Sequence, residues 1–189
     1  MNPTIESAPS RPTDGIGQAS PRCRACDAEL RDVFADLGTS PPSESFLRPE
    51  EQNAPEPGFP LKAWVCRECY LVQLEDIVDP RDIFPEYAYF SSYSDAWLKH
   101  AEDFARSMVD SRELDGGSLV VELASNDGYL LQYVLSRGVP VLGIDPAENV
   151  ALDAEQRGVR TLVEFFDADV ADRLAAGGIR ADLIIGNNV

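Results

Sequence analysis

The sequence has few basic residues, a single histidine and no long hydrophobic run. No apolar stretch approaches the roughly 18–20 residues that cross a bilayer, and residues 1–20 lack the apolar centre of a signal peptide. The 16 Lys and Arg residues stand against 33 Asp and Glu, for a formal net charge of −17. A chain this acidic has no general attraction for nucleic acid or an anionic membrane. We therefore predict a cytoplasmic protein that binds neither and has a well-solvated surface.

The N-terminal residues have little that could form a core. Residues 1–20 are rich in Pro, Ser, Thr and Gly, and we expect them to be a disordered tail. The whole chain is 44% hydrophobic, which is enough for one medium domain or two small ones. In the cytoplasm thiols stay reduced, which bears on how the four cysteines are interpreted.

The cysteines form two C-x-x-C pairs, Cys23 with Cys26 and Cys66 with Cys69. Each pair can place two thiolates about 2.3 Å from one tetrahedral ion, and two pairs form a closed shell with no open position for chemistry. A thioredoxin-like redox pair would need one C-x-x-C before a helix, and two disulfides would need an oxidising compartment. We therefore predict a structural zinc ion in a small β-rich domain over residues 21–80.

Residues 81–112 combine an aromatic segment with a helix. Ser94 is a suitable N-cap. Behind it, apolar residues follow steps of three and four positions, namely Trp97, Ala101, Phe104 and Met108, joined by Leu98, Ala105 and Val109. This spacing predicts an amphipathic helix with one buried stripe. His100 is expected at the edge of that stripe. The preceding "EYAYFSSYS" either packs against the core or presents phenol and hydroxyl groups to a polar ligand, and both interpretations stay open.

Residues 113–189 alternate between strand and helix patterns. Strands are predicted at 118–124, 139–146, 159–166 and 181–189, with helices at 128–138, 147–158 and 168–178. Nearly continuous apolar runs such as Leu119–Val121 favour a parallel sheet that is covered on both faces. In such sheets ligands bind beyond the carboxyl ends of the strands, where the strand order reverses.

The turn after the first of these strands lacks the glycines of a dinucleotide fingerprint. Gly128 is present, but Ala124 and Asn126 stand where further glycines are expected, and Glu122 and Asp127 add acidic groups. The backbone could therefore not approach a pyrophosphate closely, and the acids would repel it. S-adenosylmethionine (SAM) carries no phosphate and has two cationic groups, so the turn favours SAM over NAD. The alternative is that these acids only cap helices.

Other polar residues follow the later strands and are expected at the same edge. Asp145 ends the second strand, where an acidic side chain can accept both hydroxyls of a ribose. Asn187 and Asn188 end the fourth strand. We predict that these residues and the turn residues form the cofactor site.

Taken together, these motifs resemble the sugar C-methyltransferases of deoxysugar biosynthesis. The resemblance covers about residues 21–189 and is carried by the cysteine pairs and by the following segments: "DLGTSPPSESF", "YAYFSSYS", "VVELASNDGYLL", "VLGIDPAENVA", "TLVEFF" and "ADLIIGNNV". It implies an α/β protein with a small zinc-binding, β-rich N-terminal domain. The first half of a Rossmann-like class I SAM-methyltransferase sheet would follow, over residues 113–189.

The resemblance also implies a reaction. A base would remove the proton at carbon 3 of a nucleotide-linked 4-keto deoxysugar, and the resulting enolate would attack the SAM methyl group. Positioning and stabilisation of the enolate oxygen would supply most of the rate. By resemblance Glu122, Asp127, Gly128 and Asp145 contact SAM, and Tyr89 lies over the active site.

The chain stops on its fourth predicted parallel strand, before the residues expected to serve as the main base. We expect it to be an N-terminal fragment that is inactive alone. Two alternatives stay open: a SAM-dependent methyltransferase with another small-molecule acceptor, and a non-catalytic zinc-containing interaction module. The sugar and the oligomeric state are not determined by the sequence.

Overall fold

The computed structural model describes residues 20–43, 45–75, 77–84, 87–187 and 189. The predicted tail lies outside this range except for Ser20, as does Asn188 of the predicted cofactor site. The chain divides into two compact units, one of Met1–Ser40 with Gly58–Ile77 and the other of Pro41–Pro57 with Val78–Val189. Among the described residues no helix is both long and apolar enough to cross a membrane.

The first unit is built around three antiparallel strands in the order β1-β2-β3. These are β1 (Asp32–Ser40), β2 (Phe59–Val65) and β3 (Val72–Leu74). One C-x-x-C turn precedes β1 and the other joins β2 to β3. Among the described residues, the buried hydrophobic cluster of this unit consists of Cys23, Leu30 and Cys66. So small a core gives little hydrophobic stabilisation, and a unit of this kind depends on another source of folding free energy.

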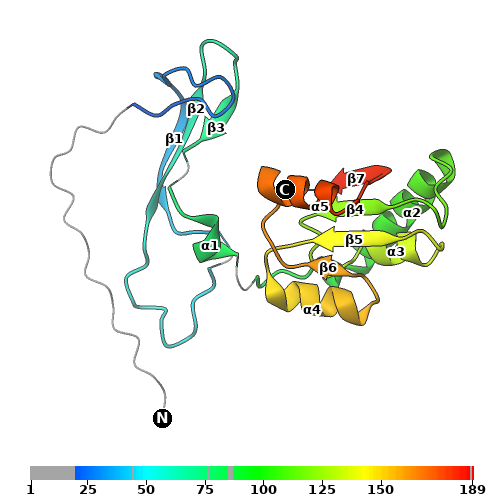
Figure 1. The fold of residues 1–189 in the computed structure, drawn as a ribbon. Coiled ribbons are helices and arrows are strands. Elements are labelled where there is room, and N and C mark those ends of the chain that lie inside the picture. The colour runs from blue at the N-terminus through cyan, green and yellow to red at the C-terminus, as the bar shows by residue number, and fades with distance from the viewer. Residues whose placement is uncertain (1–19, 44, 76, 85–86, 188) are drawn as a thin grey trace. The chain divides into compact units, whose positions relative to one another are not determined.

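The second unit contains a parallel sheet in the order β6-β5-β4-β7 (Figure 1). Its strands are β4 (Val120–Leu123), β5 (Val141–Ile144), β6 (Thr161–Leu162) and β7 (Leu183–Gly186). β4 pairs with both β5 and β7, so the chain first builds outward on one side of β4 and then crosses to the other. This reversal is the place where doubly wound sheets bind their ligands. The predicted mixed α/β fold class is confirmed.

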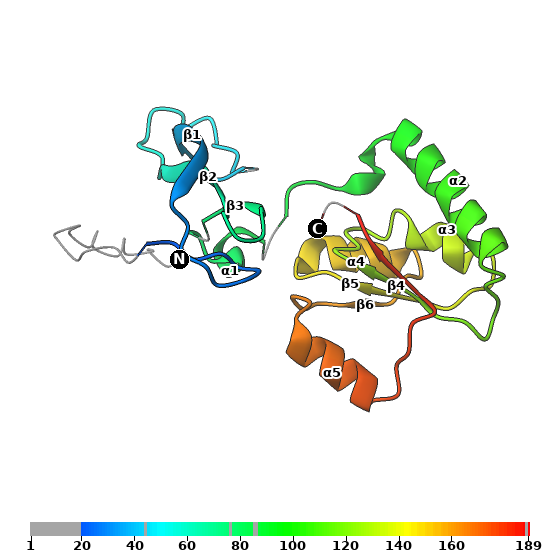
Figure 2. The same cartoon turned by 90° about the horizontal axis from the view of Figure 1, so that it is seen from above.

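Helices cover both faces of this sheet. The long helix α2 (Asp95–Ser111), α3 (Leu131–Leu135) and α4 (Glu148–Gln156) lie on one face, and α5 (Ala168–Ala176) lies on the other (Figure 2). Neighbouring residues of β4 point to opposite faces of the sheet. Val120 therefore packs in the buried cluster that includes residues of α2 and α3, and Val121 packs in the cluster that Leu174 of α5 contacts. The short helix α1 (Pro80–Ile83) and the 3₁₀ helix η1 (Ser91–Tyr93) precede α2.

Helix α2 has its predicted start, and its fully buried residues belong to the predicted stripe. The Ser94 hydroxyl accepts the Trp97 N–H at 3.3 Å, as the N-cap prediction requires. The fully buried positions are Ala101, Ala105 and Val109, whereas Trp97 is 40% exposed. These three residues share a buried cluster with Leu131 and Val134 of α3, which α2 contacts, whereas Trp97 lines a pocket described below.

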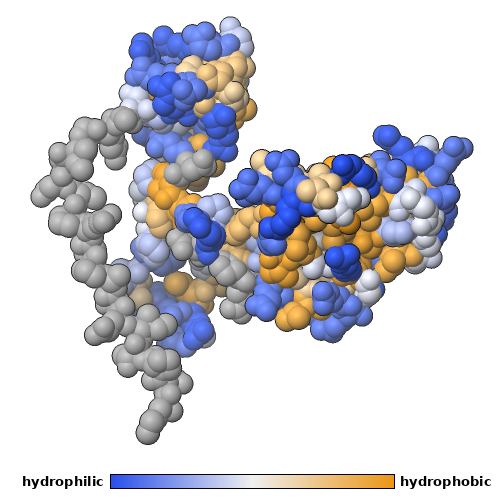
Figure 3. Space-filling model, viewed as in Figure 1, coloured by the Kyte–Doolittle hydropathy of each residue, from blue (hydrophilic) through white to orange (hydrophobic). Residues whose placement is uncertain are grey.

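Hydrophobic side chains also remain at the surface of the second unit (Figure 3). Ile184 on β7 and Val163 and Phe166 beyond β6 are among its exposed large apolar residues. β7 is an edge strand of the described sheet, and edge strands with apolar side chains are open to further pairing or packing.

Candidate functional site

Two places in the described structure bring together side chains that could bind a metal ion or a small molecule, and the first is the cysteine cluster. The four Sγ atoms all lie within 4.8 Å of one another. Cys23 lies 3.6 Å from Cys69, and Cys26 lies 3.6 Å from Cys66, measured between the sulfur atoms. A tetrahedral ion with bonds of 2.3 Å would separate its sulfur ligands by about 3.8 Å. The spacing therefore fits one four-coordinate zinc ion.

The two cysteine turns have the same backbone. The residue after each pair has a left-handed conformation, with φ 59° at Asp27 and φ 61° at Tyr70. Each donates its N–H to the first cysteine of its pair, at 2.8 Å to Cys23 O and 3.0 Å to Cys66 O. This geometry turns the two thiols of a pair toward one point, so each turn is a preformed half of the metal site.

Gln73 supports the cluster from β3, and nothing in the sequence analysis singled it out. Its side chain is buried, and its Nε2 donates to Cys23 Sγ at 3.2 Å. This hydrogen bond is the main cause that lowers the pKa of Cys23 to about 6. The Oε1 atom of Gln73 accepts the Arg24 backbone N–H at 3.0 Å. The amide thus favours the thiolate, the form that binds metal.

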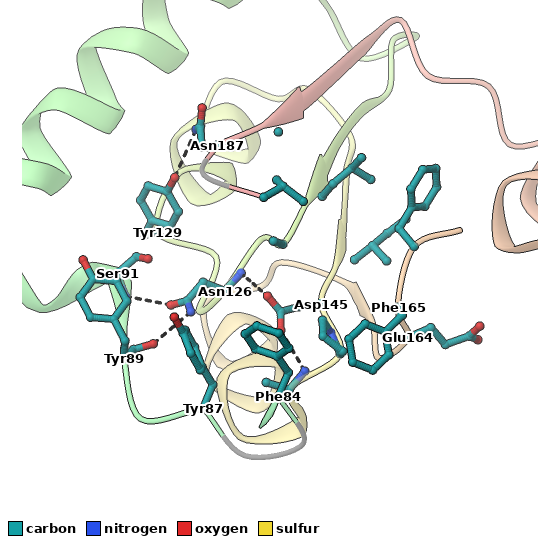
Figure 4. Close-up of a pocket in the computed structure, with 18 of the residues that line it drawn as sticks. Phe84, Tyr87, Tyr89, Ser91, Asn126, Tyr129, Asp145, Glu164, Phe165 and Asn187 are labelled. Atoms are coloured by element: carbon teal, nitrogen blue, oxygen red, sulfur yellow. Dashed lines mark hydrogen bonds between the residues drawn. The ribbon is translucent and has the colours of Figure 1, made fainter. Parts of the chain in front are cut away.

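The second place is a pocket of about 580 Å³ at the carboxyl ends of the parallel strands (Figure 4). This size is within the usual range for a small-molecule site. Tyr129 and Asn187 lie at one end of it, and Phe84 and Phe165 lie at the other. Its aromatic lining residues are Phe84, Tyr87, Tyr89, Trp97, Tyr129, Phe165 and Phe166.

The charged groups of this pocket are acidic. Asp145 and Glu164 are its charged lining residues, and no Lys, Arg or His lines it in the part of the chain that the structure describes. Glu164 forms an ion pair with Arg173, so Asp145 is the lining carboxylate that has no cationic partner among the ion pairs of the described residues. A pocket with this lining suits a cationic ligand with a flat ring system, because aromatic faces and carboxylates both attract cations.

The turn after β4 has three residues with a left-handed backbone, of which one is a glycine and two are not. Ala124 has φ 51° and Asn126 has φ 49°, beside Gly128 with φ 73°. A side chain at Gly128 would approach Val159 and Ala154 at 3.1–3.2 Å. Gly128 is therefore needed for close packing of the turn on the α4–β6 connection, and the positions expected to be glycine keep the left-handed backbone without it.

Asp145 joins this turn to the turn after β5. One carboxylate oxygen accepts the Asn126 N–H and the other accepts the Ala147 N–H, both at 2.9 Å. Burial is the largest influence and raises the pKa of Asp145, although the two N–H groups oppose it. Each oxygen keeps a lone pair that can accept a ligand hydroxyl.

Glu122 is a fully buried acid beneath the pocket. Neither of its carboxyl oxygens has a hydrogen-bond partner among the described residues. Burial raises the pKa of Glu122 to about 8, the nearby Tyr129 hydroxyl lowers it in part, and the charges of Asp145 and Asp127 raise it further. An unpaired buried acid costs folding free energy, and such groups mark candidate functional sites.

The predicted site residues fall into three groups. Tyr89, Ala124, Asn126, Asp145 and Asn187 line the pocket. Three others, Glu122, Asp127 and Gly128, are buried and are absent from its lining, and Asn188 is outside the described residues. Asn187 donates to the Tyr129 hydroxyl at 3.2 Å.

The aromatic segment before α2 is held against this edge by side chains. The Asn126 amide donates to Tyr89 O at 3.0 Å and accepts the Ser91 N–H at 2.8 Å. Asn149 on α4 both accepts the Tyr87 N–H and donates to Tyr87 O. The aromatic segment therefore forms part of the pocket wall.

Several residues of the site were not identified from the sequence. Phe165 and Phe166 directly follow β6, so their place after a parallel strand was a usable signal for a pocket position. Tyr129 and Asn149 offered no such signal, because each depends on contacts with residues far away in the chain.

Comparisons with known proteins found a family model and a curated relative that match this chain. Residues 23–84 match the family model Methyltransf_13, described as "Putative zinc binding domain". C-methyltransferase NovU of Streptomyces niveus is 33% identical over 164 residues, which cover 87% of this chain and 39% of that protein. The chain thus spans well under half the length of this relative.

Two solved methyltransferase structures show weaker similarity. Magnesium protoporphyrin IX methyltransferase of Synechocystis PCC 6803, with bound SAM, is 20% identical with a TM-score of 0.38 over 49% of this chain and 44% of its own. The plantazolicin methyltransferase BpumL, in complex with SAH, is 15% identical with a TM-score of 0.29 over 51% and 43%. These scores are too low to support an argument about fold or ligand.

The family match and the relative confirm the predicted resemblance to C-methyltransferases that carry a zinc-binding domain. The family model covers residues 23–84, which overlap the predicted zinc-binding domain of residues 21–80, and the four cysteines of this segment lie together. Residues 23–84 match the model of a zinc-binding domain family, and most of the chain is similar in sequence to a C-methyltransferase.

Proposed function

We propose that this chain provides the zinc-binding and cofactor-binding parts of a SAM-dependent C-methyltransferase that acts on a nucleotide-linked keto-deoxysugar. The single observation that carries the proposal is the acidic and aromatic pocket at the carboxyl edge of the sheet. The sulfonium and ammonium groups of SAM are cations, and its adenine is a flat ring. A dinucleotide would bring a pyrophosphate to a pocket whose charged lining residues, Asp145 and Glu164, are both acidic.

The predicted SAM contacts remain part of this proposal. Asp145 would accept ribose hydroxyls with its remaining lone pairs, and Ala124 would let the cofactor approach the turn. Glu122 and Asp127 would act from beneath the pocket through their negative charge, and Gly128 would keep the turn packed. SAM supplies the methyl group of the reaction.

Tyr89 is the proposed residue nearest to the acceptor. Tyr89 is 47% exposed and lines the pocket, while its backbone oxygen accepts a hydrogen bond from the Asn126 side chain. A phenol held in this way can donate a hydrogen bond to the carbonyl oxygen of the sugar as negative charge develops there. This role depends on the acceptor being a ketone, as the resemblance implies.

The zinc site is proposed to be structural. Four thiolates close the coordination shell, so no position is open to a substrate or to water. Cys23, Cys26, Cys66 and Cys69 would hold the ion, and its binding would supply folding free energy to a unit that has three buried core residues.

Calorimetric titration tests the cofactor assignment. We expect the chain to bind SAM and S-adenosylhomocysteine, and to bind NADH much more weakly. An Asp145→Asn variant should weaken SAM binding by about tenfold, because a neutral amide loses the charge and one acceptor. Glu155→Gln, at an exposed position on α4, is the matched control. Tighter binding of NADH than of SAM would contradict the proposal.

A further inference from the structure

Residues 87–92 cross the cofactor edge without belonging to the sheet, and we call them the tyrosine strap. Their backbone forms hydrogen bonds with the Asn126 side chain in the turn after β4 (Figure 4) and with the Asn149 side chain on α4. Burial ends where the strap ends: Ser91 is buried, whereas Tyr93, the residue that follows the strap, is 93% exposed.

Asn149 holds the first end of the strap. Its Oδ1 accepts the Tyr87 N–H at 3.0 Å, and its Nδ2 donates to Tyr87 O at 2.7 Å. One side-chain amide thus satisfies both backbone groups of a single residue. This pairing needs a donor and an acceptor together, so a carboxylate or an alkyl group cannot replace it.

Asn126 and Asp127 hold the rest of the strap. The Asn126 amide bridges Tyr89 O and the Ser91 N–H, so its hydrogen-bonding groups are already engaged by the strap. Asp127 Oδ2 accepts the Ser92 N–H at 3.2 Å. Arg157 adds a bond to the Ser92 hydroxyl at 2.9 Å, and it lies 3.4 Å from Asp127.

The two asparagine contacts meet at Asp145. Asp145 accepts the backbone N–H of Asn126 on one side and that of Ala147 on the other. Ala147 is the N-cap residue of α4, two positions before Asn149. A closed circuit of hydrogen bonds and short backbone links therefore connects Tyr87, Asn149, Asp145 and Asn126.

Tyr87 and Tyr89 of the strap belong to a row of aromatic rings along the pocket. Phe165 and Phe84 have ring centroids 6.4 Å apart, Phe84 and Tyr87 are 5.7 Å apart, and Tyr87 and Tyr89 are 6.5 Å apart. These are edge or tilted contacts at ordinary aromatic distances. Moving Tyr87 would therefore disturb both Phe84 and Tyr89.

We propose that Asn149 and Asn126 are positioning residues whose side-chain amides hold the tyrosine strap in place as a wall of the cofactor pocket. This inference rests on the proposed function, because the wall matters for binding only if the pocket takes SAM. Asn149 is the better residue to test, since it does not line the pocket and acts on a ligand only through the strap.

The test compares Asn149→Asp and Asn149→Leu with the unaltered chain, and Asn53→Asp at an exposed position is the matched control. Hydrogen exchange of peptides covering residues 87–92 is measured without cofactor, and SAM binding is measured by titration calorimetry. We expect faster exchange of the strap in both Asn149 variants, with exchange in β4 and β5 unchanged. The dissociation constant for SAM should rise by roughly tenfold in both variants. Leucine loses both hydrogen bonds to Tyr87, whereas aspartate keeps the acceptor for the Tyr87 N–H but loses the donor to Tyr87 O and places a negative charge beside that oxygen. The control should change neither.

The two readouts separate this inference from the proposed function. Unchanged strap exchange in both variants would overturn the inference. So would faster exchange combined with unaltered SAM affinity, because the strap would then be held without forming a functional wall. Failure of the unaltered chain to bind SAM would instead count against the proposed function, and the exchange measurement alone would then decide whether Asn149 holds the strap. Melting temperatures and exchange in β4 and β5 show whether a variant is folded.

Discussion

Glu122 shows how a single residue can conflict with the stability of the fold around it. It lies on the central strand β4, is fully buried and has no hydrogen-bond partner for either oxygen among the described residues. Asp145, Asp127 and Tyr129 are the titratable groups that act on it. A cationic ligand in the pocket above would compensate this acid, so its cost in the free chain is consistent with a binding role.

We predict that Glu122→Gln stabilises the chain at high pH. The pKa of Glu122 is raised from 4.5 to about 8 in the folded state, so the folded chain holds this proton more tightly than the unfolded chain. The favourable contribution is therefore complete below pH 4.5 and is lost as the pH rises toward 8. Glutamine mimics the neutral acid, so the variant should gain roughly 3–5 kcal/mol over the unaltered chain at pH 8–9 and almost nothing near pH 4.5.

Urea unfolding of the two chains at a series of pH values measures this difference. Glu155→Gln serves as the control, because Glu155 is exposed on α4. A stability difference for Glu122→Gln that stays flat from pH 5 to pH 9 would show that the acid is not held neutral in the folded state.

At the scale of elements, the turn after β4 matters most. Ala124 and Asn126 both have left-handed backbone, and only asparagine of the two adopts this region readily. The neighbouring strand β5 needs Gly143, because a Cβ there would lie 2.4 Å from the Ser125 hydroxyl of this turn. The turn is thus compressed against β5, which keeps Asp145 within reach of the Asn126 N–H.

We expect Ala124→Gly to stabilise the second unit by about 0.5–1 kcal/mol, since glycine carries no penalty for a positive φ. Ala101→Gly, in the middle of α2, should instead destabilise it by about 1 kcal/mol or more. Chemical denaturation followed by circular dichroism measures both. Equal destabilisation by the two substitutions would mean that Ala124 is not strained.

At the scale of the whole molecule, the chain consists of two units with different sources of stability. Among the described residues, the first has one cluster of three buried hydrophobic residues and a four-cysteine cluster, whereas the second has a cluster of twelve buried residues and a further cluster of three. Loss of metal should therefore affect the units unequally.

We predict that removing zinc with a strong chelator unfolds the first unit and leaves the second folded. Hydrogen exchange should become fast in β1–β3 and stay slow in β4 and β5. Cys66→Ser should have the same effect without a chelator, and metal analysis of the unaltered chain should find a single zinc ion. Retention of slow exchange in β2 after complete metal removal would argue against a structural zinc site.

The sequence by itself determined the features that depend on neighbouring residues. Each cysteine turn closes within five residues, and the Ser94 cap acts within three. The alternation of strands and helices was also readable, because side-chain periodicity is local. The cysteine pairs, the turn after β4 and Asp145 could be singled out as candidates for that reason.

Only the tertiary structure decided which of these groups line the pocket and which make contacts inside the fold. The bond from the Tyr87 N–H to Asn149 joins residues 62 positions apart, and that from the Ser91 N–H to Asn126 joins residues 35 apart. No local pattern encodes such pairs, so neither the role of Asn149 nor the engagement of the Asn126 amide was predictable. Trp97 lines the pocket for the same reason, because its ring stacks on that of Tyr129, 32 positions away in the chain, at a centroid distance of 6.0 Å.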